Sequence, residues 1–457
     1  RAVSDIEVYW RADDRDALSF TQLGGSDSWT IRIPTADLNG EDARLHAAGF
    51  DGDVHSMTDT VVLDPDSQSV EYPNRPPEWM EDGVMYQIFP RSFMGPPEPG
   101  EWPFENSNAN FDNFSDKLDY LEELGIDVIW FTPIVPGESS NWKPQAYKRG
   151  SDNINFKYSG GGPHGYDALT YLQVAEDLGS EYSIDDYYDD PQTRQAAREN
   201  ALEEFKSFMD AAHDRDIKIC FDLVINHSGR HHPFFQDTIA SKTGTTPDGW
   251  TYQGVDSWDT NSKYFDWFDR KDAPITTDSG DMVEPAPSPT GFAGLRVMPN
   301  LNYANVALRE HILSIAEFWS GEVGIDAFRC DIAYGVPHDF WKEVRQLIRA
   351  KDSDVFLLDE AIPYGPRFSE GEFDMHFDEV LAENVRAIGQ GGVDAEQVLE
   401  ATTERKRRGV PDWTTFLQYI ETHDMRRYLD VAEKTAERAA AAATFTLPGV
   451  PMISSIM

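Results

Sequence analysis

The sequence predicts an α/β fold, a (β/α)8 TIM barrel, and two observations carry this prediction. From residue 84 onward, eight short apolar segments alternate with amphipathic helical segments, as a repeated βα unit requires. Most of these segments are almost continuously apolar, which is typical of parallel strands buried on both faces. The eight predicted strands are Val84–Phe89, Asp127–Thr132, Ile217–Ile225, Gly324–Asp331, Val355–Asp359, Asp374–Phe377, Phe416–Ile420 and Gly449–Ile456.

The remaining regions are assigned around this barrel, which takes up residues 84–457. Short alternating segments in residues 1–63 predict a partial N-terminal β-sandwich-like domain, and residues 64–83, with four prolines, predict a linker. A stretch after the third strand, at about 228–305, is too long for a plain loop and predicts an inserted subdomain. The sequence stops after the eighth strand, so we expect the last helix and a C-terminal domain to be missing.

The charge of the chain excludes two classes of partner. The sequence has 81 acidic and 39 basic residues, a formal net charge of −42. Such an excess repels nucleic acids and anionic membranes, so neither is expected as a partner. No apolar run reaches the length of about 18 residues that spans a bilayer. Hydrophobic residues make up 40% of the chain, enough for a substantial core.

The balance of basic residues suggests a saline environment. Arginine outnumbers lysine two to one among the 39 basic residues, and the pI is near 4.4. This composition resembles that of proteins from salt-accumulating halophiles; the alternative is an acidic mesophilic protein. At 1 M salt the Debye length is only about 3 Å, so self-repulsion is screened. We therefore predict that stability rises with salt, and we favour the cytoplasm of a salt-accumulating cell over secretion.

The two cysteines, Cys220 and Cys330, are not expected to form a disulfide. Strand alternation places Cys220 on the face that carries Asp222, whereas Cys330 lies on the face opposite Arg329 and Asp331. The two thiols are therefore predicted to point to different sides of the barrel wall.

Charged and polar side chains gather at the carboxyl ends of four predicted strands. Working sites of such barrels lie at that end, and several carboxylates placed together there are costly unless function requires them. The set comprises Asp222, Asn226 and His227 at the third strand, Arg329 and Asp331 at the fourth, Glu360 after the fifth, and His423 and Asp424 after the seventh.

These segments, in this order, resemble the signature regions of the α-amylase superfamily, glycoside hydrolase family 13. They read Asp-Leu-Val-Ile-Asn-His, Phe-Arg-Cys-Asp, Leu-Leu-Asp-Glu-Ala and Ile-Glu-Thr-His-Asp, and the similarity extends from Val84 through Pro451. It includes Tyr-Gln-Ile-Phe-Pro-Arg-Ser-Phe from residue 86 and His-Gly-Tyr-Asp from residue 164. The segment Met-Pro-Asn-Leu-Asn from residue 298 resembles the neopullulanase and cyclomaltodextrinase version.

The resemblance implies a catalytic triad. Asp331 would be the nucleophile, Glu360 the general acid and base, and Asp424 the carboxylate that stabilises the transition state. A retaining glycosidase holds its nucleophile and its acid about 5–5.5 Å apart, with the nucleophile ionised. Arg329, two residues before Asp331 on the same strand face, is expected to keep that carboxyl deprotonated. The alternative is that these carboxylates form structural salt bridges at the end of the barrel. Salt bridges explain Asp222 well, but they do not explain the three carboxylates Asp331, Glu360 and Asp424.

The resemblance also implies the residues that bind sugar. A lone histidine is usually a core or surface residue, but position at a strand end favours contact with substrate. Asp222 is expected to order its strand end rather than touch sugar. The predicted substrate-binding residues are Tyr166, His164, His227, Arg329 and His423.

Two departures from the family pattern affect the reading. Tyr334 and Gly335 stand where many members have Lys-His, which weakens a strict α-amylase assignment. For calcium, Asn226 matches a family ligand and is the only plausible one carried over, whereas Asn300 replaces a carboxylate. No cofactor is expected for the chemistry, and a structural calcium ion is compatible with the resemblance but not expected.

The leading functional prediction is retaining hydrolysis of α-1,4-glucosidic bonds in starch or maltodextrins, with an α-glucan as the partner. Two alternatives stay within the same chemistry: glucosyl transfer, and a preference for α-1,6 or cyclic substrates. The alternative of another class is a catalytically silent family member used for binding, which loss of a catalytic carboxylate would mark. The sequence fixes neither the substrate preference nor the oligomeric state.

Overall fold

In a computed structural model of the chain, the described residues comprise seven short N-terminal strands and most of the barrel. Beyond the N-terminal strands, the residues that the structure describes are 76–94, 109–137, 164–181, 191–242, 254–276, 279–352, 354–361, 371–388, 393–407 and 414–455.

Eight parallel strands close into a barrel, which confirms the predicted fold class. Each overlaps one predicted segment, and neighbours in the barrel follow the order β10-β17-β18-β19-β20-β21-β8-β9. The strands are β8 (Met85–Ile88), β9 (Val128–Phe131), β10 (Lys218–Leu223), β17 (Ala327–Cys330), β18 (Phe356–Asp359), β19 (Met375–Phe377), β20 (Thr415–Gln418) and β21 (Val450–Ser454).

Alternation along these strands produces two apolar layers. Trp130, Leu358 and their counterparts on other strands fill the barrel interior, whereas residues such as Leu357 pack outward against the helices. Cys220 belongs to the inner layer and Cys330 to the outer one, and both are free. The expectation that they do not pair is confirmed.

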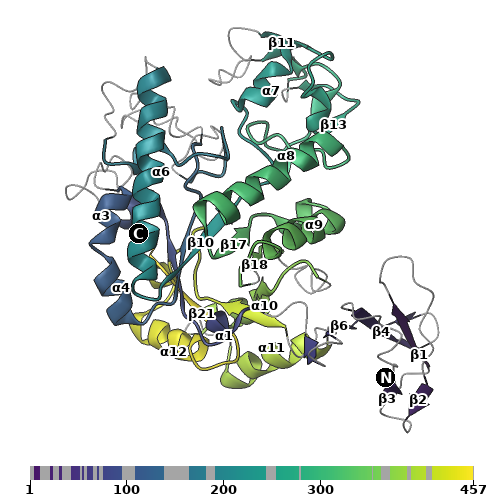
Figure 1. The fold of residues 1–457 in the computed structure, drawn as a ribbon, viewed down its shortest axis with the longest axis vertical. Coiled ribbons are helices and arrows are strands. Elements are labelled where there is room, and N and C mark those ends of the chain that lie inside the picture. Colours follow the sequence, from purple (N-terminus) through teal and green to yellow (C-terminus); the bar gives the residue numbers. More distant parts are fainter. Residues whose placement is uncertain are drawn as a thin grey trace.

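Helices surround the barrel, with α3, α4 and α6 along one side and α8 and α9 along another (Figure 1). Gly125, at φ +76°, ends α4 in the left-handed conformation that glycine adopts without strain. The helix α3 begins after Asn110, whose side chain accepts from the Asn113 N–H. The helices are α1 (Glu78–Glu81), α2 (Pro90–Phe93), α3 (Phe111–Ser115), α4 (Leu118–Leu124), α6 (Pro191–His213), α8 (Val306–Glu317), α9 (His338–Arg349), α10 (Glu379–Arg386), α11 (Ala395–Arg407) and α12 (Lys434–Thr444).

The insertion after β10 forms small two-stranded sheets and the helix α7 (Pro233–Asp237), and it extends from one end of the barrel in Figure 1. Hydrogen bonds tie it to the end of β10, from the Ser228 N–H to the Pro299 carbonyl and from the Leu301 N–H to the Asn226 carbonyl. Its strands are β11 (Ile239–Lys242), β12 (Val255–Trp258), β13 (Arg270–Lys271), β14 (Ile275–Thr276), β15 (Met282–Glu284) and β16 (Ser288–Pro289).

The N-terminal strands are antiparallel where they pair. One sheet has the order β1-β4-β6-β7, with β5 on β4, and β2 pairs with β3. The stretch predicted as a linker holds β7 and α1, so it is not wholly irregular. The strands are β1 (Asp5–Trp10), β2 (Thr21–Leu23), β3 (Thr30–Arg32), β4 (Ala43–Asp51), β5 (Val54–His55), β6 (Asp59–Asp64) and β7 (Ser69–Glu71).

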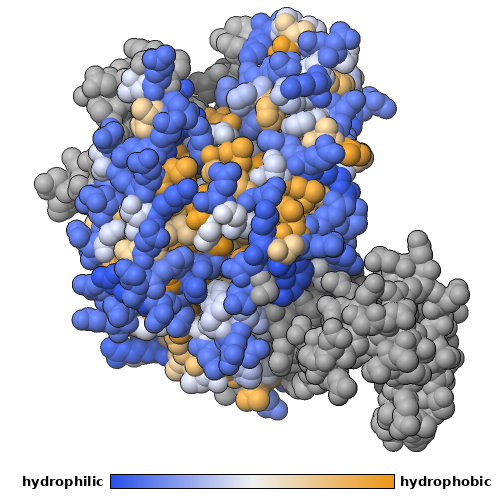
Figure 2. Space-filling model, in the orientation of Figure 1, coloured by the Kyte–Doolittle hydropathy of each residue, from blue (hydrophilic) through white to orange (hydrophobic). Residues whose placement is uncertain are grey.

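Hydrophilic side chains cover most of the described surface on the face shown in Figure 2, and apolar side chains gather toward its centre. Within the described ranges, every helix is too short or too polar to traverse a bilayer.

Candidate active site

A single buried guanidinium, that of Arg329, gathers three carboxylates at the carboxyl end of the barrel. Its Nη1 lies 2.8 Å from Asp222 Oδ1 and 2.8 Å from Asp331 Oδ1, and its Nη2 lies 2.8 Å from Glu360 Oε2. The three acids come from β10 and from the ends of β17 and β18, which are neighbouring strands. Parallel pairing places Asp222 beside Arg329 in register.

The shared guanidinium limits the distance between Asp331 and Glu360. Arg329 Nη1 contacts Asp331 and Nη2 of the same planar group contacts Glu360. The two carboxylate oxygens that make these contacts therefore lie within about 8 Å of each other. This limit is compatible with the carboxylate spacings of glycosidases, and it excludes a separation beyond the range that either the retaining or the inverting mechanism uses.

One positive charge cannot neutralise three negative charges in a buried cluster. Burial raises the pKa of Asp222 to about 6 against the attraction of Arg329. The pKa of Asp331 is also raised, first by burial and then by Glu360 and Asp222, while Arg329 pulls it down. Arg329 thus acts on Asp331 in the expected direction, but in the substrate-free site it divides its charge among three acids and does not offset burial.

Two aromatic side chains, Tyr166 and Trp130, contact this cluster. The Tyr166 hydroxyl donates to Asp222 Oδ2 at 2.9 Å, and the Trp130 indole N–H donates to the same oxygen at 3.1 Å. The Arg329 guanidinium lies 5.1 Å from the Trp130 ring centre and 5.7 Å from that of Tyr166. The Asp222 carboxylate thus has three polar partners within the protein, Tyr166, Trp130 and Arg329, which is consistent with a role in ordering its strand end.

His423 and Asp424 follow β20 and differ sharply in burial. The His423 ring is stacked on Tyr166, with centroids 5.1 Å apart and planes 5° apart. Its Nε2 lies 3.3 Å from Asp424 Oδ2, and the Asp424 side chain is 64% exposed. Burial lowers the pKa of His423 to about 3, with Arg329 adding to the effect. The ring is therefore neutral, so its approach to Asp424 is not an ion pair.

His227 and His164 also border Tyr166. The His227 ring bonds to the Tyr166 carbonyl through Nε2 at 2.9 Å and to the Asn226 amide through Nδ1 at 3.1 Å. His164 Nδ1 accepts from the Tyr166 N–H at 2.9 Å. Burial lowers the pKa of His227 to about 4 and that of His164 to about 3. The structure brings all five predicted sugar-binding residues together, but both ring nitrogens of His227 are engaged with the protein.

Sequence reasoning missed three residues of this site. Gln87, on β8, contacts His423 through its side-chain amide; its polarity within an apolar strand and its place in the segment that resembles the family were the available signals. Phe292, in the insertion, stacks on His227 with ring centroids 5.2 Å apart. Ile332 has φ 45° and ψ 47°, a strained conformation for a β-branched residue, and its N–H donates to Glu360 Oε2 at 2.9 Å.

The described residues do not assemble a metal site. Within the described ranges, no three His, Cys, Asp or Glu side chains gather to hold an ion. The Asn226 side chain contacts His227, and its Oδ1 occupies the space that a Cβ at Gly335 would need. This neutral donor set does not fit calcium, which favours several carboxylate oxygens. The absence of a metal requirement stays a prediction.

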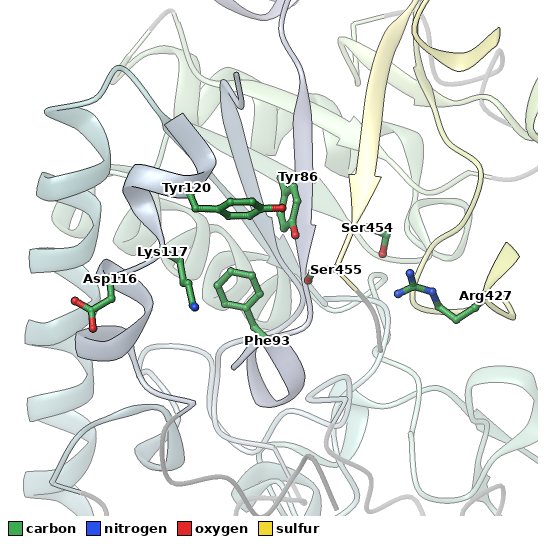
Figure 3. A pocket seen from close by; sticks show the side chains of 8 residues that line it. All are labelled: Tyr86, Phe93, Asp116, Lys117, Tyr120, Arg427, Ser454 and Ser455. Atoms are coloured by element: carbon green, nitrogen blue, oxygen red, sulfur yellow. The ribbon is translucent and has the colours of Figure 1, made fainter. Parts of the chain in front are cut away.

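A cavity of about 590 Å³ lies away from this cluster, on the outside of the barrel beside β8 and β21 (Figure 3). Tyr86 and Tyr120 lie next to each other in its lining, which also includes Lys117 and Arg427. Tyr86 alternates with Gln87 on β8, so its side chain points away from the barrel interior. The cavity is not part of the carboxylate site.

The fold and the site together define a parallel barrel with a carboxylate cluster at its carboxyl end, where barrel enzymes work. Residues 87–455 match the family model described as alpha amylase, catalytic domain. The chain belongs to this family, glycoside hydrolase family 13.

Individual relatives agree with this assignment. The chain is 32% identical over 462 residues to alpha-amylase MalA of Haloarcula japonica, covering 98% of the chain and 56% of that relative. It is 26% identical over 397 residues to a cyclomaltodextrinase of a Bacillus species, covering 83% of the chain and 59% of the relative. The chain thus spans a little over half the length of these relatives.

Solved structures share the fold. The cyclic α-maltosyl-(1→6)-maltose hydrolase of Arthrobacter globiformis, in complex with maltose, superposes with a TM-score of 0.62 at 23% identity, covering 83% of this chain and 75% of that chain. An α-amylase from H. orenii gives a TM-score of 0.58 at 24% identity, covering 82% of this chain and 68% of that one.

Proposed function

We propose that this chain is a retaining glycoside hydrolase that cleaves α-glucosidic bonds of starch or maltodextrins by double displacement. The observation that carries the proposal is the gathering of Asp331 and Glu360 on one buried guanidinium. Family membership and the named relatives support the same chemistry.

In the first step an Asp331 oxygen attacks the anomeric carbon while the glycosidic C–O bond breaks. Glu360 gives its proton to the departing oxygen, leaving a glucosyl ester on Asp331 and a carboxylate on Glu360. This step requires Glu360 to carry a proton and Asp331 to be ionised in the productive complex.

In the second step Glu360 takes a proton from water, whose oxygen attacks the anomeric carbon and releases Asp331. Two inversions give net retention. The Ile332 N–H and Arg329 both donate to Glu360 Oε2, which stabilises the ionised form between the steps. Asp424, at the open side of the site, stabilises the positive charge that develops on the sugar ring.

The neutral side chains define the sugar-binding surface. His423 and His164 remain uncharged at neutral pH because burial lowers the pKa of each to about 3. Neutral imidazoles donate or accept without adding charge beside Asp331. Tyr166 supplies a flat aromatic face for the sugar ring. No metal is required by these steps.

The test is a Glu360→Gln variant assayed on maltodextrin in molar salt. Loss of the proton donor and base lowers kcat by at least about 10²-fold. Undiminished cleavage would refute the assignment. Starch, pullulan, cyclodextrin and maltose, tested in parallel, separate α-1,4, α-1,6 and cyclic preferences, and product analysis with acceptor sugars separates hydrolysis from transfer.

The environment is a further part of the proposal. The acidic composition and the similarity to a haloarchaeal relative support a cytoplasm rich in salt. Salt dependence of stability, described below, is the measurement that bears on it.

A further inference from the structure

Gln87 lies in the barrel interior next to the candidate active site, and the mechanism above gives it no role. The residue is fully buried on β8, beside the inward-facing Trp130 of β9 and two positions after the inward-facing Met85. A buried amide among apolar side chains is costly unless its donors and acceptor are satisfied. Its partners therefore indicate why the position is polar.

The orientation of the Gln87 amide follows from a group that can only donate. The backbone N–H of His423 points to Gln87 Oε1 at 3.2 Å, and the Ser454 hydroxyl lies 2.9 Å from the same atom. Because a backbone N–H cannot accept, the atom facing it must be the amide oxygen. The other amide atom, Nε2, then faces His423 Nδ1 at 2.9 Å.

This orientation fixes the tautomer of His423. The Gln87 NH2 group has no acceptor, so Nδ1 must accept and the ring proton must lie on Nε2. Nε2 is the atom that faces Asp424 Oδ2 at 3.3 Å. Protonation of Nδ1 would set two donors against each other. The other groups around the ring are Tyr166, stacked on it, and Trp130, edge-on at 5.9 Å, with Arg329 and Glu360 acting through their charges.

We propose that Gln87 is a positioning residue that holds His423 as the neutral Nε2–H tautomer, so that the Nε2–H, on the side of the ring that faces Asp424, donates to a hydroxyl of the bound sugar. The part that concerns sugar rests on the proposed function, whereas the tautomer does not. Gln87 acts through His423 and touches no reacting atom. Two bonds, one to the ring and one to the backbone of the same residue, make the device specific to His423.

The direct test is ¹⁵N NMR of the histidine-labelled 457-residue chain, with a His423→Asn variant to identify the resonance. In the wild type at neutral pH we expect the shifts of a bare Nδ1 and a protonated Nε2. In Gln87→Glu, the carboxylate accepts from Nδ1–H, so Nδ1 becomes protonated. Gln87→Met, which removes the donor without adding charge, releases the ring to a mixture of tautomers.

Activity and stability complete the experiment. We expect kcat on maltodextrin to fall about 10²-fold in Gln87→Glu, as when one preorganised donor is removed, with a smaller change in KM. Ser454→Ala is the matched control, because it removes a bond to Gln87 but leaves both bonds to His423. It should keep the wild-type tautomer and kcat. Thermal unfolding of each variant checks that folding is retained, and Gln87→Met serves if the glutamate variant does not fold.

Two results would overturn the inference: a protonated Nδ1 in the wild type, or a wild-type tautomer and kcat in both Gln87 variants. If the wild type cleaves no α-glucan while His423 shows the predicted tautomer, the proposed function fails and the role of Gln87 in setting the tautomer stands.

Discussion

Two buried charge clusters in this protein have opposite balances. At the barrel mouth, one guanidinium, that of Arg329, is surrounded by three carboxylates. In the insertion, one buried carboxylate, Glu284, is held by two guanidiniums, with Arg230 Nη2 at 2.6 Å and Arg296 Nε at 3.0 Å. The two clusters use the same chemical groups in inverse proportion.

The difference distinguishes a functional cluster from a structural one. A structural carboxylate is surrounded by enough positive charge to keep it ionised, which offsets its desolvation. At the mouth, burial raises the pKa values of Asp222 and Asp331, and the single Arg329 guanidinium does not offset this effect. Negative charge without enough positive charge nearby lowers the stability of the fold. The same negative charge can accept protons and stabilise a cationic transition state.

The largest expected effect is on catalysis. Asp331→Asn should lower kcat on maltodextrin by at least about 10⁴-fold, because the nucleophile is removed. Asp374→Asn is a matched control, since Asp374 is a buried carboxylate paired with Arg345 and Arg349 rather than with substrate. It should lower stability while kcat stays within a few-fold of the wild type. Equal losses of kcat in both variants would contradict the comparison.

The second effect concerns the structural cluster. Glu284→Gln removes the carboxylate that Arg230 and Arg296 share, and we expect a loss of roughly 3–5 kcal/mol in unfolding free energy, as when one partner of a buried ion pair is removed. Denaturant titration measures it. A variant as stable as the wild type would show that the insertion does not depend on this ion pairing.

How far the sequence predicts these clusters depends on the range of the interactions involved. Short apolar runs between helical segments predicted all eight barrel strands, and their positions at strand ends singled out Asp331, Glu360 and Arg329, because both are local patterns. The sharing of Arg329 among three acids was not predicted, since it depends on side chains from three strands meeting at one point.

The missed residues illustrate the same limit. Gln87 and His423 are 336 positions apart and meet only because β21 closes the barrel against β8. Phe292 reaches His227 through the fold of the insertion. The left-handed backbone of Ile332 is imposed by the turn after β17, against the preference of a β-branched side chain.

A third effect extends the comparison to the surface. With a net charge of −42, we expect the thermal midpoint to rise by several degrees between dilute buffer and molar potassium chloride, because screening removes self-repulsion. A non-ionic osmolyte at equal osmolality is the control. An unchanged midpoint in salt would remove the argument for a saline environment.

The smallest effect is a change in pH dependence. Burial lowers the pKa of His232 to about 3, and its ring caps α7 by accepting from the Phe234 N–H. A lowered folded pKa gives stability that is present above the unfolded value of about 6.5 and is lost as pH falls toward 3. His232→Asn keeps a cap but removes this proton linkage. The variant should therefore lose less unfolding free energy than the wild type between pH 7 and pH 4.

The excess of negative charge around Arg329 is tested most directly by the unfolding free energy of Asp331→Asn, measured as a function of pH. A raised folded pKa means that ionised Asp331 weakens the fold above the unfolded value of about 3.9. The inactive variant should therefore be more stable than the wild type at pH 7, and the difference should shrink toward pH 4. A variant less stable than the wild type at pH 7 would contradict the account.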